Sequence, residues 1–373
     1  MLTDLDVRPY QQGDEEDIIQ LLTLVFKDWS PENLSCAPLD HWRWKYLDNP
    51  GGGNAITLAI SSGKLIGVQH CFMKLIKIGD EDIICRYSGD QCVHPDFRRM
   101  GVATKLEDSN REMSGICGDQ YAYYVTSNPY MIKSYERRRP RFPHDVLNLF
   151  RIQDIDKQLQ AMPMKNPGLM KLGYLTMKSI NRAKNIINVD SSNKHDFHIN
   201  EIKEFDERVN PFWEEVSRHY NYITVRNKDY LNWRYSDPRA GNNIILQAER
   251  DDQILGFCVL AIKRQLENYP IGYFLDLLTL PDSLNVAEAL IEDAVDYLTN
   301  NGVNIICCQT IDNHPHESLL TRQGFVNSMI NLQLFYRPYG DDGIKSLKSA
   351  PANRIHFTFG DIDTLPTELP AAR

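Results

Sequence analysis

The sequence predicts an α/β protein in which one fold, a mixed and mostly antiparallel sheet flanked by helices, occurs twice in tandem. The first observation is a short aromatic signature that appears at two places, as DHWRWKY and as DYLNWRY. The second is the spacing beyond it, because Trp44 and Trp233 each stand 23 residues before a glycine, Gly67 and Gly256, in similar surroundings. Self-similarity that keeps its spacing is typical of a duplicated structural unit.

Hydrophobic periodicity predicts the order of elements in the first copy. Ile18, Leu21, Leu22 and Val25 recur at helical spacing, which predicts an amphipathic helix. Apolar and β-branched runs broken by Ser-Gly and Gly-Asp are typical of antiparallel strands. The predicted order is a strand at 6–8, a helix at 15–26, three antiparallel strands within 55–93, a helix at 101–114, a strand at 120–127 and a helix that ends near Tyr135.

The second copy is expected to repeat this order. It begins with the strand-like runs NIILQAERDDQILGFCVLAI and IGYFLDLLTL. The predicted elements that follow are a helix at 287–299, a strand at 304–310 and a helix that ends near Leu320. This order predicts a mixed sheet covered by helices. In the tail after Tyr339, RIHFTFGDIDTL is predicted to be strand-like and to pack back on the second domain.

Residues 151–196 are more polar and are interrupted by MPMKNPG, so we expect a helical linker between a first domain at 1–150 and a second domain at 197–373. One side of the linker helix would carry Leu169, Leu172, Met177, Ile180 and Ile187, and the other Lys171, Lys178, Arg182 and Lys184. A connecting helix docked across the two domains is the favoured interpretation because the apolar face is weak. A basic amphipathic helix on a membrane surface is the alternative.

Composition excludes several classes of protein. The 373 residues are 42% apolar and 24% charged, as in soluble globular proteins. The formal net charge of −9 argues against a general nucleic-acid binder, which needs an excess of Lys and Arg. No run approaches the ~18 apolar residues that span a bilayer, and the first residues do not resemble a signal peptide, so a cytoplasmic location is expected. The eight cysteines form no CxxC pair, which indicates neither a zinc site nor a disulfide framework.

The connection VHPDFRRMGVATKL, between a predicted strand and a predicted helix, has residues suited to an anion. Unpaired N–H groups and the positive end of the helix dipole attract an anion at a helix N-terminus, the dipole by about 0.3–1 kcal/mol. Gly101 lets the backbone approach a ligand closely, and Arg98 and Arg99 can donate charge-assisted hydrogen bonds. A solvated basic turn is the alternative. The pattern has neither the Gly-Lys-Ser/Thr of a P-loop nor the three-glycine spacing of a dinucleotide fingerprint.

This segment resembles the pyrophosphate loop of the GNAT acyltransferase superfamily, in which Arg or Gln, two residues, Gly, one residue, and Gly or Ala follow one another. Arg98, Gly101 and Ala103 match that pattern. The resemblance implies acetyl-CoA or another acyl-CoA as co-substrate, no metal, and a splayed strand before the loop whose backbone pairs with the pantetheine arm. The residues that it assigns to the cofactor are Gln91, Cys92, Val93, Arg98, Arg99, Met100, Gly101, Val102, Ala103, Thr104 and Asn128.

Two residues are candidates for catalysis. The family's next motif, an Asn followed seven residues later by a Tyr, matches Asn128 and Tyr135, although the usual Gly-Phe after the Tyr is replaced by ERRRPRF. The resemblance makes Tyr135 the acid for the departing thiolate; an aromatic packed in the core is the alternative. Asp90 is the best-placed carboxylate for a general base, with Tyr87 and His94 as rivals and a plain turn residue as the alternative.

Two further features have more ordinary interpretations. The basic run ERRRPRF is expected to be solvated surface, with the 3′-phosphate of CoA or an acidic acceptor as alternatives. Trp44 and Trp233 are expected to anchor the core of their own copies, with stacking on a sugar as the alternative.

The second copy departs from the motif where chemistry would need it. Its connection LPDSLNVAEAL is shorter and has neither arginine nor glycine, and Leu320 stands in the place of Tyr135. We therefore expect only the first copy to bind acyl-CoA. The expected function is acyl-CoA-dependent N-acyltransfer, with acetyl passing by direct attack in a ternary complex to a primary amine of a small molecule or aminosugar. A non-catalytic acyl-CoA-binding or regulatory protein and an aminoacyl-tRNA-dependent peptidyl transferase are the alternatives. No oligomeric state is predicted.

Overall fold

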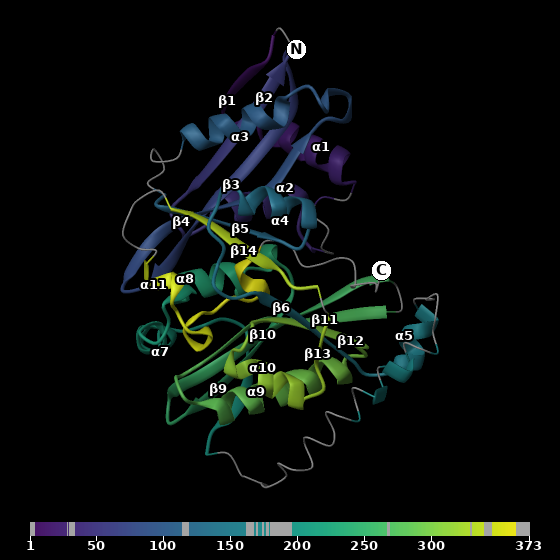
Figure 1. Cartoon of the computed structure of the whole chain (residues 1–373), viewed down its shortest axis with the longest axis vertical. Helices are drawn as coiled ribbons and strands as arrows, with labels where there is room; N and C mark the ends of the chain where they lie inside the picture. Colours follow the sequence, from purple (N-terminus) through teal and green to yellow (C-terminus); the bar gives the residue numbers. More distant parts are fainter. Residues whose placement is uncertain are drawn as a thin grey trace.

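The structure is a computed structural model with two mixed sheets, each flanked by helices (Figure 1). It describes residues 4–27, 29, 34–113, 119–161, 168, 171–173, 175–176, 179, 196–266, 269–328, 330–338 and 345–362. The fold class expected from the sequence is confirmed. Most of the predicted linker helix, including Leu169, Met177, Ile180 and Ile187, lies outside the described residues.

The first sheet has the strand order β1-β2-β3-β4-β5-β14, and β8 also pairs with β3. Its strands are β1 (Asp6–Pro9), β2 (Asn54–Ser61), β3 (Lys64–Ile78), β4 (Glu81–Val93), β5 (Tyr121–Thr126), β8 (Tyr222–Thr224) and β14 (Gln333–Pro338). Its helices are α1 (Glu15–Phe26), α2 (Pro38–Tyr46), α3 (Val102–Glu112) and α4 (Pro129–Glu136). Two neighbouring residues of β2 pack against different helices. Leu58 belongs to the buried cluster that contains residues of α1, and Ala59 belongs to the cluster that contains residues of α3. Successive strand residues point to opposite faces, so α1 and α3 cover opposite faces of the sheet.

The second sheet has the order β13-β6-β12-β11-β10-β9-β7. Its strands are β6 (Val146–Ile152), β7 (His198–Ile202), β9 (Asn243–Arg250), β10 (Gln253–Leu266), β11 (Tyr269–Thr279), β12 (Ile305–Ile311) and β13 (Val326–Asn327). The helices beside it are α5 (Ile155–Ala161), α7 (Val209–Ser217), α8 (Lys228–Leu231), α9 (Leu284–Asn300) and α10 (Pro315–Arg322). The duplication seen in the sequence is therefore a duplication of the sheet, with a parallel pair at the centre of each copy, β4 with β5 and β11 with β12.

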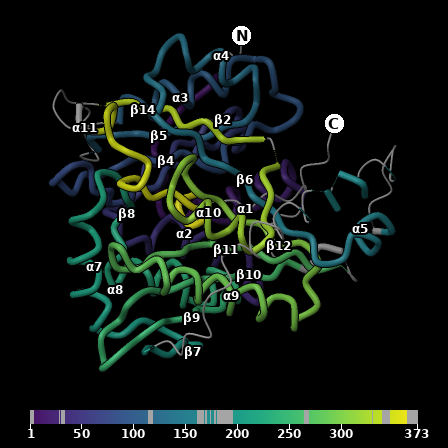
Figure 2. Tube along the Cα trace, turned by 60° about the horizontal axis from the view of Figure 1, so that its bottom comes forward, coloured from purple at the N-terminus to yellow at the C-terminus, as the bar shows by residue number. Residues whose placement is uncertain are grey.

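The two copies exchange their closing strands. β6, which follows the first copy in the chain, pairs antiparallel with β12 of the second sheet over all of its seven residues. β14, which comes from the second half of the chain, pairs antiparallel with β5 of the first sheet. Figure 2 shows β14 beside β5 and β6 beside β12. The predicted boundary at residue 150 falls inside β6, so a division by sequence does not coincide with the division between sheets.

The repeated tryptophans lie where the two copies meet. Trp44 and Trp233 stack with ring centroids 5.1 Å apart and planes 22° from parallel. Each indole N–H donates to the other residue's carbonyl oxygen, at 2.7 Å from Trp44 and 3.0 Å from Trp233. The expectation that each Trp anchors its own copy was wrong, because the two side chains form one reciprocal contact that joins the copies.

The tail also joins the two copies, and its predicted strand is not formed. Residues 352–354 and 359–361 form 3-10 turns, η4 and η5, and the residues between them are extended with an isolated bridge from Ile355 to Tyr222. Asp361 binds both halves, because its carboxylate pairs with Arg226 and its carbonyl oxygen accepts from Lys74 of β3 at 2.8 Å. The tail therefore packs between the copies and not on the second one alone.

A buried charge network holds the tail in this position. Arg226 is 0% exposed and lies between two carboxylates, Asp276 at 2.8 Å and Asp361 at 3.1 Å. Burial opposes ionisation of Asp361, yet the nearby Arg226 guanidinium brings the pKa of this carboxyl to about 2. The buried charges balance, because Lys74 and Arg226 are positive and Asp276 and Asp361 are negative. Buried charges are stable only when they are paired in this way.

Arg226→Met should destabilise the protein by about 3–5 kcal/mol, because it leaves two buried carboxylates without their cation. The free energy of unfolding in urea measures this loss. Arg208→Met is the control, since Arg208 makes its ion pairs with its side chain 38% exposed and its loss should cost at most about 1 kcal/mol. Equal losses in the two variants would contradict this account of the network.

A fragment ending at residue 150 should not form a cooperative fold, because it lacks β14 and leaves most of β6 without the sheet in which that strand is buried. Far-UV circular dichroism with thermal melting of the fragment and of the full chain provides the comparison. A fragment that melts in a sharp transition like that of the full chain would show that the exchanged strands are dispensable.

Candidate active site

The first sheet opens between its two central strands. β4 and β5 pair in parallel at only three positions, Cys85–Tyr87 with Tyr121–Tyr123. Beyond them β4 stays paired with β3, while β5 continues against β14. Among the described residues no strand pairs with this free edge of β4, from residue 88 to Val93, although the Val93 carbonyl oxygen accepts from Nε of Arg98 at 3.3 Å. An unpaired strand edge offers a row of N–H and C=O groups to an extended ligand.

A bulge lies at the start of this free edge. The register of β4 against β3 passes from Val68 opposite Cys92 to His70 opposite Gly89, so two residues of β4 stand opposite one of β3. Asp90 is the first of the two, and its φ of 42° is in the left-handed region that non-glycine residues rarely adopt. The bulge thus coincides with a residue that the sequence marked as a candidate.

One carboxylate oxygen of Asp90 is bound by two residues of the aromatic signature. Its Oδ2 atom accepts from Lys45 Nζ at 2.8 Å and from the Tyr46 hydroxyl at 2.6 Å. The nearby lysine holds the pKa of Asp90 far below its usual range, although burial opposes this. A carboxylate with so low a pKa is a weak proton acceptor. The assignment of Asp90 as general base stays a prediction.

The predicted cofactor loop lies directly after the free edge. A 3-10 turn, η1 (Pro95–Phe97), leads to Arg98 and Arg99, and both arginines and Met100 are exposed. Gly101 stands at the N-cap of α3 with a φ of 83°, supplies no side-chain cap, and has open space around the position of a Cβ atom. The first N–H groups of α3, from Val102 to Thr104, have no partner within the helix. The loop therefore has the donors and the positive charge that an anion needs.

The other predicted cofactor residues have well-defined surroundings. Gln91 is exposed and its amide donates to Gln69 at 3.1 Å, whereas Cys92 is buried. Burial raises the pKa of the Cys92 thiol to about 12, so this thiol stays protonated and is not a nucleophile. Asn128 caps α4, because its Oδ1 atom accepts from the backbone N–H groups of Tyr130 and Met131. The sequence missed this capping role for Asn128.

Tyr135 lies on α4 in a cage of three side chains. Its ring is 5.4 Å from that of Tyr124, 5.5 Å from that of Phe335 and 4.4 Å from the guanidinium of Arg139. Partial burial raises the pKa of Tyr135, so its hydroxyl keeps its proton at neutral pH. Arg139 also reaches Glu107 of α3 at 4.0 Å, which places the Tyr135 helix next to the helix of the anion loop. Phe335 comes from β14, so the second half of the chain contributes to this site.

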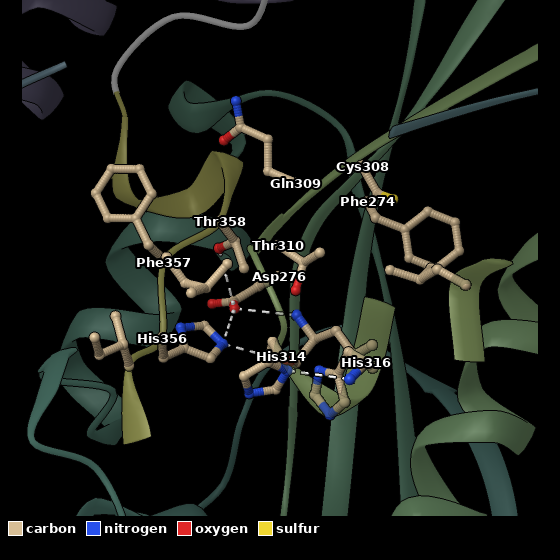
Figure 3. A pocket seen from close by; sticks show the side chains of 14 residues that line it. Phe274, Asp276, Cys308, Gln309, Thr310, His314, His316, His356, Phe357 and Thr358 are labelled. Carbon is tan, nitrogen blue, oxygen red and sulfur yellow. Dashed lines mark hydrogen bonds and ion pairs between the residues drawn. The ribbon is translucent and has the colours of Figure 1, made fainter. Parts of the chain in front are cut away.

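The matching opening in the second copy is narrowed to a small pocket by the tail. β11 and β12 pair at Ile271–Tyr273 with Ile305–Cys307 and then diverge. Figure 3 shows the small pocket between them, closed on one side by Phe357 and Thr358 of the tail. His356 donates from Nε2 to the carbonyl oxygen of Leu277 at 3.1 Å, and a Cβ atom on Gly360 would stand 2.0 Å from the Tyr235 hydroxyl. The tail therefore lies along the part of β11 that corresponds to the free edge of β4.

Two residues of these sites escaped the sequence analysis. Asp276 is the counterpart of Asp90, since it accepts from the Tyr235 hydroxyl at 2.9 Å as Asp90 does from Tyr46. The pattern Tyr-x-x-Asp-x-x-x-x-Pro-Asp begins at Tyr87 and again at Tyr273, and this repeat could have revealed Asp276. Phe335 carried no comparable signal, because its place beside Tyr135 depends on the strand exchange.

Family models match both copies. A model described as "Acetyltransferase (GNAT) domain" matches residues 6–138, and one described as "Acetyltransferase (GNAT) family" matches residues 202–325. The chain is a tandem GNAT protein. It belongs to the GNAT acyltransferases in both halves, as its resemblance to that family predicted. No curated protein matches the sequence of the whole chain significantly.

Solved structures share the fold of this tandem GNAT protein at low sequence identity. N-myristoyltransferase of Saccharomyces cerevisiae with bound myristoyl-CoA and inhibitors is 12% identical with a TM-score of 0.58, over 91% of this chain and 81% of that chain. A probable N-acyltransferase from Enterococcus faecalis is 8% identical with a TM-score of 0.61, over 92% and 75%. A GCN5-related N-acetyltransferase from Anabaena variabilis is 10% identical with a TM-score of 0.58, over the same shares. These likenesses show that the tandem arrangement itself recurs.

Within the described ranges no group of His, Cys, Asp or Glu side chains is arranged to hold a metal ion. No helix among the described residues is long and apolar enough to cross a membrane. The seven described cysteines are free, and all but Cys36 are buried.

The tandem GNAT protein should lose stability as the pH falls below about 6.5, because several histidines are buried without charge. Burial lowers the pKa of His316 to about 3, so between pH 6.5 and 3 the unfolded chain binds a proton at this residue that the folded chain does not. His316→Gln should reduce the dependence of unfolding free energy on pH by about 1.4 kcal/mol per pH unit near pH 5. Urea unfolding between pH 5 and 7 measures it, with exposed His198→Gln as control. An unchanged slope in His316→Gln would contradict this assignment.

Proposed function

We propose that this tandem GNAT protein transfers an acyl group, in the first instance acetyl, from acyl-CoA to the primary amine of a small molecule or aminosugar, at a single site in the first copy. The observation that carries the proposal is the free edge of β4, which a loop with a 3-10 turn connects to the uncapped N-terminus of α3, where Arg98 and Arg99 are exposed. One extended ligand with an amide-bearing arm and a pyrophosphate would use both features at once.

In this proposal the cofactor-binding residues have separate tasks. The backbone of Gln91, Cys92 and Val93 pairs with the pantetheine arm. The segment from Arg98 to Thr104 holds the pyrophosphate through the N–H groups of Gly101, Val102, Ala103 and Thr104 and the charge of the arginines, with Met100 between them. Asn128 contributes by capping α4 and so holding Tyr135 in place.

The proposed reaction is a direct transfer. The unprotonated amine nitrogen attacks the thioester carbonyl carbon, the C–N bond forms and the C–S bond breaks. The amine nitrogen gives up its proton to water, and Tyr135 regains a proton from water after it has protonated the thiolate. Tyr135 donates its hydroxyl proton to the departing thiolate. The protonated and buried Cys92 thiol supports this route over an acyl-cysteine intermediate. The raised pKa of Tyr135 keeps its proton available.

The second copy is proposed to bind no acyl-CoA. Its connection at 280–283 has no arginine, and Leu320 lines the pocket in the place of Tyr135. The tail already lies along the part of β11 that a pantetheine arm would need. One molecule of acyl-CoA per chain is therefore expected.

Acetyl-CoA should bind the full chain with a stoichiometry of one in isothermal titration calorimetry, and Arg98→Ala should weaken it about tenfold, because one charge-assisted contact to phosphate is lost. Arg111→Ala is the matched control, since it removes a positive charge from the far end of the same helix. Two molecules per chain, or no binding at all, would reject the proposed site.

Tyr135→Phe should lower kcat by about a hundredfold while leaving the affinity for acetyl-CoA within about twofold, because only the transferable proton is removed. Release of free thiol over a panel of amines measures kcat and also identifies the acceptor. Tyr130→Phe is the control on the same helix, where the side chain is 84% exposed. A variant that keeps full kcat would leave Tyr135 as a packing residue only.

A further inference from the structure

The bulge of β4 is held at the side chain of Asp90 by the aromatic signature and at its backbone by His70 of β3. The carboxylate is bound by Lys45 and Tyr46, which are consecutive at the end of α2. The carbonyl oxygen of the same residue accepts from Nδ1 of His70 at 3.0 Å. Side chain and backbone of one residue are therefore tied to two different elements.

The histidine in this arrangement is itself oriented. The indole of Trp42 donates to Nε2 of His70 at 2.9 Å, which leaves the proton of the neutral ring on Nδ1, where it faces the Asp90 carbonyl oxygen. Burial lowers the pKa of His70 to about 4, so the ring is neutral at physiological pH. Trp42, Lys45 and Tyr46 all belong to the signature that identified the repeat.

The conformation held in this way is costly for an ordinary residue. Aspartate adopts positive φ more readily than most residues but still at a cost, and residues held in such conformations by their surroundings gather at functional sites. The bulge lies within the free edge, beyond Tyr87, the last position at which β4 pairs with β5, and Asp90 directly precedes Gln91–Val93. The torsions of Asp90 therefore set the direction in which the groups of that edge point.

The second copy has the same Tyr–Asp pair without this backbone conformation. Tyr235 donates to Asp276, and β11 also has a register shift there, but Asp276 does not have a positive φ. Arg234, which replaces Lys45, donates instead to carbonyl oxygens of the tail at Gly360 and Ile362. The left-handed bulge and the lysine that binds it occur together in the copy with the open edge.

We propose that Asp90 is a positioning residue, held by Lys45, Tyr46 and His70, whose left-handed bulge aligns the free edge of β4 for the acyl-CoA thioester and its pantetheine arm. This inference rests on the proposed function, because it assumes that the edge receives acyl-CoA. Asp90 then takes no proton in the reaction. The aromatic signature of the first copy acts on catalysis through the backbone of β4.

The first experiment compares one hydroxyl in each copy of the full chain. Tyr46→Phe removes the bond to Asp90, and Tyr235→Phe removes the equivalent bond to Asp276 in the copy without an open edge. We expect Tyr46→Phe to weaken acetyl-CoA binding about five- to tenfold in calorimetry and Tyr235→Phe to leave it within twofold. Equal affinities in the two variants would overturn the proposal. Failure of the wild-type chain to bind acetyl-CoA would instead reject the proposed function.

The second experiment separates backbone from proton transfer at Asp90 itself. Glycine adopts positive φ freely and alanine does not, so positioning predicts that Asp90→Gly binds acetyl-CoA at least fivefold more tightly than Asp90→Ala. Asp90→Asn, which tolerates positive φ, should keep the shape of the pH profile of kcat and raise the KM for acetyl-CoA. A general base predicts the reverse, with equal binding in the Gly and Ala variants and an altered profile in Asp90→Asn. Circular dichroism and thermal melting establish that each variant is folded.

Discussion

The exchange of β6 and β14 is the constraint on which the rest of the structure depends. Each sheet is completed by a strand from the other half of the chain, so neither half has a full sheet by itself. Strand pairing satisfies the backbone groups of β5 and β12, which would otherwise be unpaired edges. The exchange also brings Phe335 against Tyr135, and the candidate active site of the first copy thereby includes a side chain from the second.

Three contacts between the copies follow from that arrangement. The stacked and reciprocally bonded Trp44 and Trp233 join the two signatures. The tail lies between the sheets, where Asp361 connects Lys74 of one copy with Arg226 of the other. The largest apolar cluster is continuous across both copies, since it includes Trp42 and Tyr46 as well as Phe257 and Tyr273. Such a shared core holds the copies in one relative orientation, which a site built from both halves requires.

Each copy has an opening where its parallel strands separate, β4 from β5 and β11 from β12, but the two openings differ in what lies in them. In both copies the central parallel pair separates after three positions, and in both a tyrosine of the signature binds an aspartate beside the separation. The first opening leads to a helix that begins at Gly101 beside two exposed arginines, and no strand among the described residues pairs with its edge. The second is occupied by the tail and bounded by uncharged, buried histidines. The same Tyr–Asp hydrogen bond thus lies beside an unpaired strand edge in one copy and beside a packed interface in the other.

The sequence by itself determined the duplication, the fold class and several helices and strands of each copy, because these depend on periodicity and spacing, and it predicted the anion loop from the chemistry of neighbouring residues. Helix α1 was predicted at its observed bounds, and the loop from Arg98 to Ala103 lies at a helix N-terminus as its residues indicated. Only the tertiary structure decided which sheet receives β6 and β14, that Trp44 meets Trp233, and that Asp90 is bound by Lys45 and Tyr46. These are pairings between residues far apart in the chain. No local sequence pattern encodes which distant residue will be the partner. The charge state of each buried group then depends on the residues that surround it in the folded protein.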